Sequence, residues 1–102
     1  MKVSVIVPFK EGKKYLEDCL DSLLEYCFDG TEVLLVLDHG CEDIRELLTV
    51  YEKKLTMRIF ELHDKTGVAA ARNLGVQKAQ GEFLFFLDSD DYLDASLSEL
   101  YS

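Results

Sequence analysis

The most informative stretch of this chain is FLFFLDSDD (Phe83–Asp91), in which five consecutive large apolar residues run into three aspartates. Such a continuous apolar run is typical of a strand buried on both faces of a parallel sheet, so we expect a strand over residues 83–87. Asp88 and Asp90 are two positions apart, and an extended backbone points them to the same side. Neighbouring carboxylates repel one another unless a cation joins them, and their oxygens suit Mg²⁺ or Mn²⁺. The alternative at this point is a solvated acidic turn that only ends the strand.

Length and composition predict one globular domain over residues 1–102. The chain is 48% hydrophobic and carries a formal net charge of -9. The apolar content suffices for a core, whereas the acidic balance argues against a nucleic-acid partner, which needs a basic patch. An anionic ligand of this protein would need a cation, or basic groups placed locally.

Cysteine usage and hydropathy predict a cytoplasmic protein. Cys19, Cys27 and Cys41 have no metal-ligand spacing, and the first two fall on the apolar stripe of a predicted helix, as buried thiols do. The start of the sequence shows no signal-peptide pattern, and no apolar run reaches membrane-spanning length. We therefore expect a location in the cytoplasm, or at the cytoplasmic face of a membrane if another segment or partner anchors the protein.

Apolar periodicity predicts strands that alternate with helices. We expect strands over residues 3–7, where Pro8 ends the first strand, and over 33–37, 57–62 and 83–87, with helices over 15–27, 44–55 and 67–79. This β-α-β-α-β-α-β order is typical of an α/β protein, a parallel sheet with helices on both faces. With right-handed crossovers, and the fourth strand returning beside the first, the strand order is 3-2-1-4. The third strand, whose residues alternate, is expected at an edge.

Polar segments follow three of the predicted strands. They are Pro8–Gly12, Asp38–Gly40 and Asp88–Asp91. In such sheets, ligands bind in the crevice at the carboxyl ends of the strands, where the strand order reverses. Because all three segments converge on that crevice, a binding site is favoured over an acidic turn.

Four segments resemble, in order and spacing, the nucleotide-sugar-binding half of family 2 glycosyltransferases with the GT-A fold. They are VSVIVP (3–8), YLEDCLDSL (15–23), ARNLG (71–75) and GEFLFFLDSDD (81–91). The resemblance implies a Rossmann-like GT-A half-domain that takes part in transferring a sugar from a nucleoside diphosphate donor to an acceptor hydroxyl. It further implies Mn²⁺ or Mg²⁺ as the cofactor, a donor that is commonly UDP-linked, and an unidentified glycan, lipid or cell-surface precursor as the acceptor.

The resemblance also implies roles for individual residues. Asp90 matches the metal ligand and Asp91 a second or alternate ligand, whereas Asp88 matches a contact to the ribose or sugar. Asp38 matches the residue that binds the base, and the alternative is a helix cap or an Asx-turn. Arg72 is placed to reach the pyrophosphate, and the alternative is a solvated helix arginine.

Pro8, Lys10 and Glu11 complete the predicted donor site. The family often has an aromatic-Asn pair after the first strand, where this chain has Lys10 and Glu11. Lys10 is close enough to touch a phosphate, and Glu11 can accept a hydrogen bond from a base or ribose. The family often has paired aspartates after the second strand, where this chain has Asp38 and His39. Both departures leave the identity of the base open.

Family members usually continue through an acceptor-binding half that contains the catalytic base. This chain ends shortly after Asp91, and no residue matches that base, so the sequence predicts a donor-binding half with unknown catalytic residues. In the order 3-2-1-4, the apolar segment 83–87 is an edge strand, which is a hazard for aggregation. We therefore expect a homodimer that covers this edge.

Three other functions compete with this interpretation. A non-catalytic or truncated nucleotide-sugar-binding module is the main alternative, because the catalytic base is missing. An aspartate-nucleophile phosphatase also places Asp-x-Asp after a strand, but after the first strand and not the fourth. An EF-hand matches Asp88, Asp90 and Glu99 by spacing, yet Leu93 stands where the loop needs glycine, which excludes it.

Overall fold

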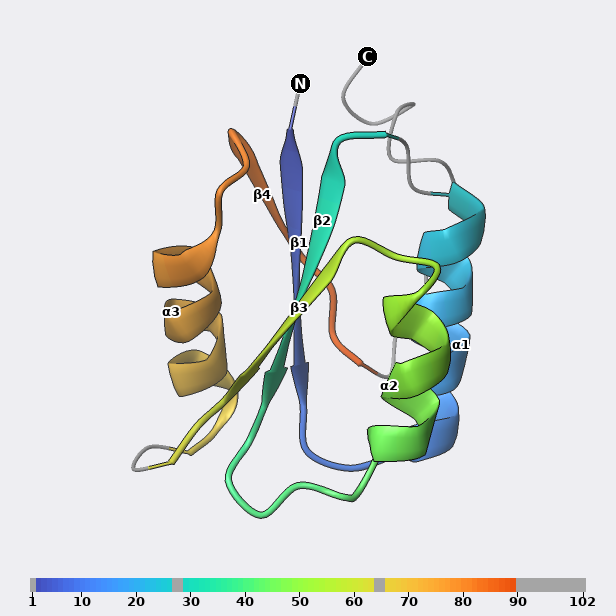
Figure 1. Cartoon of the computed structure of the whole chain (residues 1–102). Helices are drawn as coiled ribbons and strands as arrows, with labels where there is room; N and C mark the ends of the chain where they lie inside the picture. The colour runs from blue at the N-terminus through green and yellow to red at the C-terminus, as the bar shows by residue number, and fades with distance from the viewer. Residues whose placement is uncertain (1, 27–28, 64–65, 90–102) are drawn as a thin grey trace.

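The computed structural model describes residues 2–26, 29–63 and 66–89. Within this part, a parallel sheet with the order β3-β2-β1-β4 lies between two layers of helices (Figure 1). The strands are β1 (Val3–Phe9), β2 (Thr31–Leu37), β3 (Met57–Glu61) and β4 (Phe83–Phe86). The helices are α1 (Lys13–Tyr26), α2 (Arg45–Glu52) and α3 (Val68–Lys78). The predicted α/β class and the predicted strand order are therefore confirmed.

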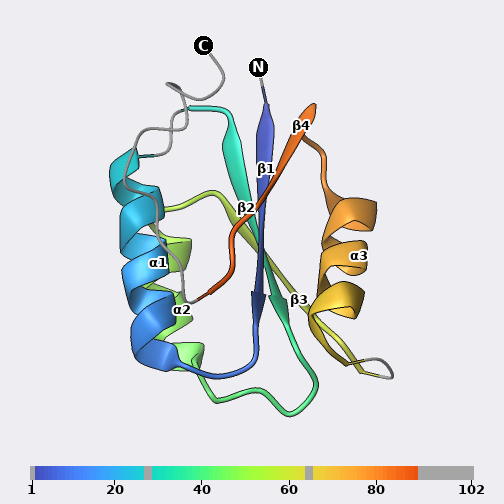
Figure 2. The same ribbon diagram turned by 180° about the vertical axis from the view of Figure 1, so that it is seen from behind.

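Helices cover both faces of the sheet, as predicted. Helices α1 and α2 lie on one face and α3 lies on the other, which is clearest when Figures 1 and 2 are compared. Alternate residues of β1 and β2 meet the first pair of helices, because successive side chains of a strand point to opposite faces. That larger core contains the buried side chains of Val5, Leu20 and Leu35, whereas the smaller core under α3 contains Val36 and Ala71.

The prediction that Pro8 ends the first strand is wrong, since β1 continues to Phe9. The Leu87 N–H donates to the Ile6 carbonyl at 3.0 Å, which places the polar groups of Ile6 on the β4 side. The backbone of Pro8 faces the same side, because the N–H and C=O groups of a strand point toward the same neighbouring strand at every second residue. Strand β4 has already ended at Phe86, so the N–H that proline lacks is not needed for the ladder.

Strand β4 is less buried than its sequence predicts. Phe83, Leu84 and Phe86 are 40%, 39% and 45% exposed, so the expectation of a strand buried on both faces is wrong. The reason is its position at the edge of the sheet, where it pairs with β1 alone in the described part of the chain. Leu87, which follows the strand, is buried in the larger core. Strand β3 lies at the other edge, as predicted.

The helix bounds differ from the predicted ranges by a few residues. Helix α1 begins two residues early at Lys13, and α2 ends at Glu52, three residues short of the predicted range. Cys19 is fully buried as predicted, whereas Cys27 lies outside the described residues. Among the helices that the structure describes, none combines the length and the apolar character that a membrane span requires.

A polar network fixes the connection from α3 to β4. The Gly81 N–H donates to the Ser4 hydroxyl at 2.8 Å, and the Gln80 N–H donates to the Glu32 carboxylate at 2.7 Å. Burial tends to raise the pKa of Glu32, but hydrogen bonds from Ser4, Gln80 and Arg58 outweigh it, and the pKa is lowered. Glu32 is therefore an ionised anchor that holds the start of β4 against β1 and β2.

Candidate functional site

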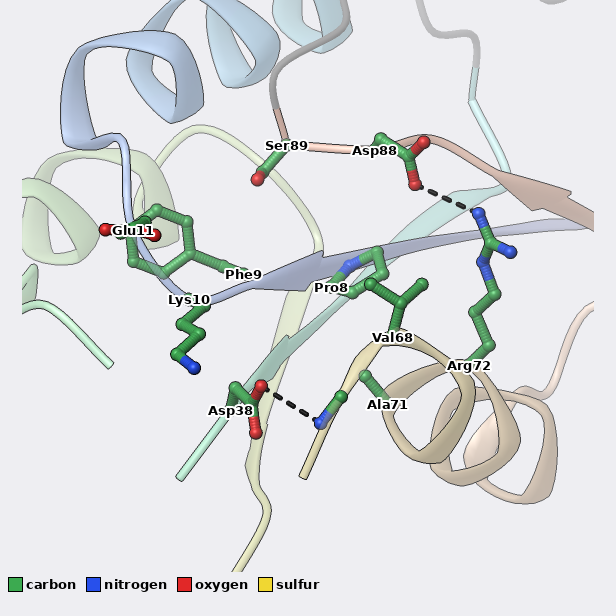
Figure 3. A pocket seen from close by; sticks show the side chains of 11 residues that line it. Pro8, Phe9, Lys10, Glu11, Asp38, Val68, Ala71, Arg72, Asp88 and Ser89 are labelled. Atoms are coloured by element: carbon green, nitrogen blue, oxygen red, sulfur yellow. Dashed lines mark hydrogen bonds and ion pairs between the residues drawn. The ribbon is translucent and has the colours of Figure 1, made fainter. Parts of the chain in front are cut away.

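A pocket of about 320 Å³ opens at the carboxyl ends of β1 and β2, beside the start of α3 (Figure 3). Its lining comes from β1 and the following loop, from the ends of β2 and β4, and from α3. The lining residues are Pro8, Phe9, Lys10, Glu11, Asp38, Gly67, Val68, Ala71, Arg72, Asp88 and Ser89. The structure thus brings together all six predicted donor-binding residues: Pro8, Lys10, Glu11, Asp38, Arg72 and Asp88. A volume of this size is typical of a small-molecule site.

Asp38 lies directly after β2 and is only 9% exposed. Its Oδ1 accepts hydrogen bonds from the Thr66 hydroxyl at 2.7 Å and from the His39 N–H at 2.8 Å. Its Oδ2 accepts one from the Gly67 N–H at 3.1 Å, drawn as a dashed line in Figure 3. The bond to His39 joins adjacent residues and is not the expected Asx-turn, which bonds to the residue two positions on; the Cys41 N–H, which donates to the Asp38 carbonyl at 3.2 Å, closes a backbone turn here instead. The bond to Gly67 ties Asp38 to the residue directly before α3, which comes later in the chain.

Asp38 is held in its ionised form. The hydrogen bond from Thr66 lowers its pKa most; burial opposes this, and the N–H groups of Gly67 and His39 and the charge of Lys10 reinforce it. An ionised carboxylate accepts hydrogen bonds and donates none. Because Oδ2 receives a single bond from the described residues, it keeps the capacity to accept another from a ligand that offers an N–H or O–H group.

Arg72 lies on α3 and extends along the rim of the pocket toward Asp88 (Figure 3). Its Nη2 is 3.1 Å from Asp88 Oδ1, and its Cζ is 5.7 Å from the centre of the Phe86 ring. The two charged side chains are 43% and 47% exposed, so this ion pair contributes little to stability. Arg72 is thus paired and stacked, contrary to the alternative of a solvated arginine. Its buried Nε has no hydrogen-bond partner in the described part of the chain.

The loop after β1 is secured by a residue from another loop. The Glu42 N–H donates to the Lys10 carbonyl at 2.8 Å, and the Lys13 N–H donates to Glu42 Oε1 at 2.9 Å. Gly12 lies between them with φ of 94°, in the left-handed region that favours glycine. These contacts place Lys10 and Glu11 at the pocket, where Lys10 extends toward Asp38 (Figure 3).

The predicted metal ligands, Asp90 and Asp91, lie outside the described residues. Over residues 2–26, 29–63 and 66–89, no group of three or more His, Cys, Asp or Glu side chains is placed to hold a metal ion. Asp88 is the described carboxylate next to the predicted ligands, and oxygen ligands of this kind suit a hard divalent cation. The described donor set is therefore compatible with a metal but does not form a metal site without Asp90 and Asp91.

Sequence reasoning missed several residues of the site. Thr66 and Gly67 precede α3. Their hydrogen bonds to Asp38 join positions 28 and 29 residues apart, so no local sequence pattern predicts them. Val68 is four positions before Arg72, a spacing that places both on one helix face, so this residue could have been inferred. Ala71 was also missed, whereas Phe9 and Ser89 fall within the segments 8–12 and 88–91 that were expected at this crevice.

The strand order reverses between β1 and β4, and the pocket lies at the carboxyl ends of the strands there. This arrangement defines a class: α/β domains that bind a ligand at a topological switch point. The family model described as Glycosyl transferase family 2 matches residues 4–101, and the chain belongs to this family. The predicted family is thereby confirmed.

Relatives of known sequence agree with this membership. The chain is 36% identical over 97 residues to poly(ribitol-phosphate) beta-N-acetylglucosaminyltransferase TarS of Staphylococcus aureus, covering 92% of this chain and 17% of TarS. It is 37% identical over 90 residues to TuaG of Bacillus subtilis, a putative teichuronic acid biosynthesis glycosyltransferase, covering 87% of this chain and 36% of TuaG. The chain therefore spans only a minor part of the length of these relatives.

Solved structures show the same fold. TarS residues 1-349 of S. aureus in complex with UDP align with a TM-score of 0.88 and 32% identity, over 99% of this chain and 31% of that one. TarS has also been solved in complex with UDP-GlcNAc. The mannosyltransferase PcManGT of Pyrobaculum calidifontis, in complex with GDP-Man and Mn²⁺, aligns with a TM-score of 0.80 and 25% identity, over 92% of this chain and 29% of that one.

Proposed function

We propose that this protein transfers a sugar from a UDP-linked donor to an acceptor hydroxyl, and that the described pocket binds the donor. The observation that carries the proposal is the convergence of Asp38, Lys10, Arg72 and Asp88 on one pocket at the switch point. Structures of TarS with UDP and with UDP-GlcNAc support a uridine nucleotide as the ligand class.

The charges around the pocket suggest how a nucleotide sugar lies in it. Asp38 Oδ2 accepts the N–H of the base, because uracil offers an imide N–H to an acceptor. Arg72 and Lys10 face the diphosphate with positive charge. Asp88 contacts the ribose or the sugar through hydrogen bonds from hydroxyl groups.

The same residues contribute to the chemistry of transfer. As the bond from the sugar to the diphosphate breaks, negative charge grows on the departing oxygen, and positive groups placed in advance lower the barrier. Arg72 is placed in advance by its contacts to Asp88 and to the Phe86 ring. A divalent metal held by Asp90 and Asp91 would supply further neutralisation of the diphosphate.

The proposal extends to the location and assembly of the protein. The protein acts in the cytoplasm or at the cytoplasmic face of a membrane. It forms a homodimer through the β4 edge, where Phe83, Leu84 and Phe86 are exposed.

Calorimetric titration of UDP into the full chain, with and without Mn²⁺, tests this function. We expect binding that strengthens with Mn²⁺, loses that dependence in Asp90→Ala, and is unchanged in the control Asp18→Ala, an exposed position on α1. Absence of UDP binding under both conditions would contradict the proposed donor. Binding without any turnover of UDP-sugars by the full chain would instead favour the non-catalytic module.

A further inference from the structure

Asp38 and Thr66 join two elements that both border the pocket. Asp38 begins the segment that follows β2, and Thr66 precedes α3, which carries Arg72. The Thr66 hydroxyl donates to Asp38 Oδ1, while the adjacent Gly67 N–H donates to Asp38 Oδ2. The two bonds hold both oxygens of the carboxylate, so its plane cannot rotate freely about the bond to Cβ.

Gly67 makes this arrangement possible through its backbone. Its φ of 100° lies in the left-handed region, and a Cβ there would meet nothing within 4 Å, so conformation and not space requires glycine. At this turn the Gly67 N–H and the Thr66 hydroxyl both donate to the Asp38 carboxylate. The Thr66 hydroxyl is therefore held where it can orient Asp38.

We propose that Thr66 is a positioning residue of the donor site: its hydroxyl fixes the Asp38 carboxylate so that Oδ2 is oriented to accept a hydrogen bond from the base. The inference rests on the proposed binding of a UDP-linked donor and deepens it. Thr66 does not line the pocket and acts through Asp38 alone.

The pH dependence of UDP binding distinguishes this role from a purely structural one, which would leave the pH dependence unchanged. Because the hydrogen bond from Thr66 is the largest cause of the lowered pKa of Asp38, its removal raises that pKa. If UDP binding needs ionised Asp38, then as the pH is lowered the variant without the Thr66 hydroxyl loses binding at a higher pH than the wild type.

The groups around Asp38 are Lys10 and Glu11 from the loop after β1, His39 and Cys41 from its own loop, Glu61 and His63 at the end of β3, and Arg72 and Asp88 across the pocket. These groups and the phosphates of UDP are the same in every variant, so only the difference between variants reports on Asp38.

The experiment compares Thr66→Val, which removes the hydroxyl, with Thr66→Ser, which keeps it. UDP affinity of the full chain is measured by calorimetry from about pH 3 to pH 8, a range that extends below the ordinary Asp pKa of 3.8. We expect Thr66→Val to bind UDP roughly fivefold to tenfold more weakly, as for the loss of one hydrogen bond, with its acid limb at higher pH. Thr66→Ser should stay within about twofold of the wild type, as should the control Thr49→Val, whose hydroxyl bonds to Arg45 on α2.

The outcomes separate this inference from the proposed function. If the wild type fails to bind UDP, the proposed function fails. If the wild type binds UDP and Thr66→Val matches it in affinity and acid limb, Thr66 does not position Asp38. Equal weakening in Thr66→Ser and Thr66→Val would also overturn the inference, because the hydroxyl would then be irrelevant.

Discussion

Gly75 is a buried glycine of α3 that packs against Ile6 of β1, and its replacement by alanine tests this packing. A Cβ at this position would lie 2.5 Å from Ile6 Cγ2, and 3.1 and 3.2 Å from Ile6 Cγ1 and Cδ1. Ile6 is fully buried on the central strand β1, so its side chain has no free space to occupy instead. Either α3 must move away from the sheet or the core must deform.

Two effects of opposite sign determine the magnitude for Gly75→Ala. Overpacking of a core costs about 1–3 kcal/mol, and the overlap with Ile6 places this case at the upper end. In a helix interior, alanine is more stabilising than glycine by about 1 kcal/mol because of its higher helix propensity. We therefore expect a net loss of about 2 kcal/mol in the free energy of unfolding, which lowers the Tm by roughly 10 °C in a domain of this size.

Urea and thermal denaturation, followed by circular dichroism, measure this loss. Gln77→Ala, at an exposed position of the same helix, is the control and should change stability by less than about 0.5 kcal/mol. Ile6→Ala removes all three atoms that the new methyl group meets, and alone it costs about 2–5 kcal/mol. In the Gly75→Ala background it should cost less, with a coupling energy of about 1–2 kcal/mol. Equal or greater stability of Gly75→Ala, or strict additivity in the cycle, would refute the close contact between α3 and β1.

Two further predictions concern charge. Arg72→Gln should weaken UDP binding about tenfold in calorimetry because it removes a charged hydrogen-bond donor at the diphosphate, whereas Arg45→Gln on α2 serves as the control; unchanged affinity in Arg72→Gln would contradict the assignment. Because the pKa of Glu32 is lowered in the folded protein, its ionised carboxylate stabilises the fold fully at pH values above the ordinary pKa of 4.5. This stabilisation is lost as the pH falls through the lowered pKa. Glu32→Gln should therefore destabilise the protein in urea at pH 7 and much less at pH 3; a loss independent of pH would show that the charge of Glu32 is not involved.

The element order follows from local patterns in the sequence. Continuous apolar runs predict the strands, because a parallel sheet buries both faces of its inner strands, and periodic apolar residues predict the helices between them. The order 3-2-1-4 needs more than the right-handed crossovers: it also requires that the fourth strand return beside the first, which the structure confirms. The same reasoning fails where burial depends on neighbours: the run in β4 matches that of an inner strand, yet its edge position leaves Phe86 45% exposed. It fails likewise at Pro8, since whether a missing N–H matters depends on where β4 ends.

For the site, local sequence shows which polar residues follow the strands, and the sheet topology brings them together. The contacts that orient them join positions far apart in the chain: Thr66 and Asp38 are 28 residues apart, and Arg72 and Asp88 are 16 apart. No local period links such pairs, because their distance depends on how α3 docks against β1 and β2. Local sequence thus determines which charged and polar residues follow the strands. The orientation of the Asp38 and Arg72 side chains arises only from the packing of α3 on the sheet.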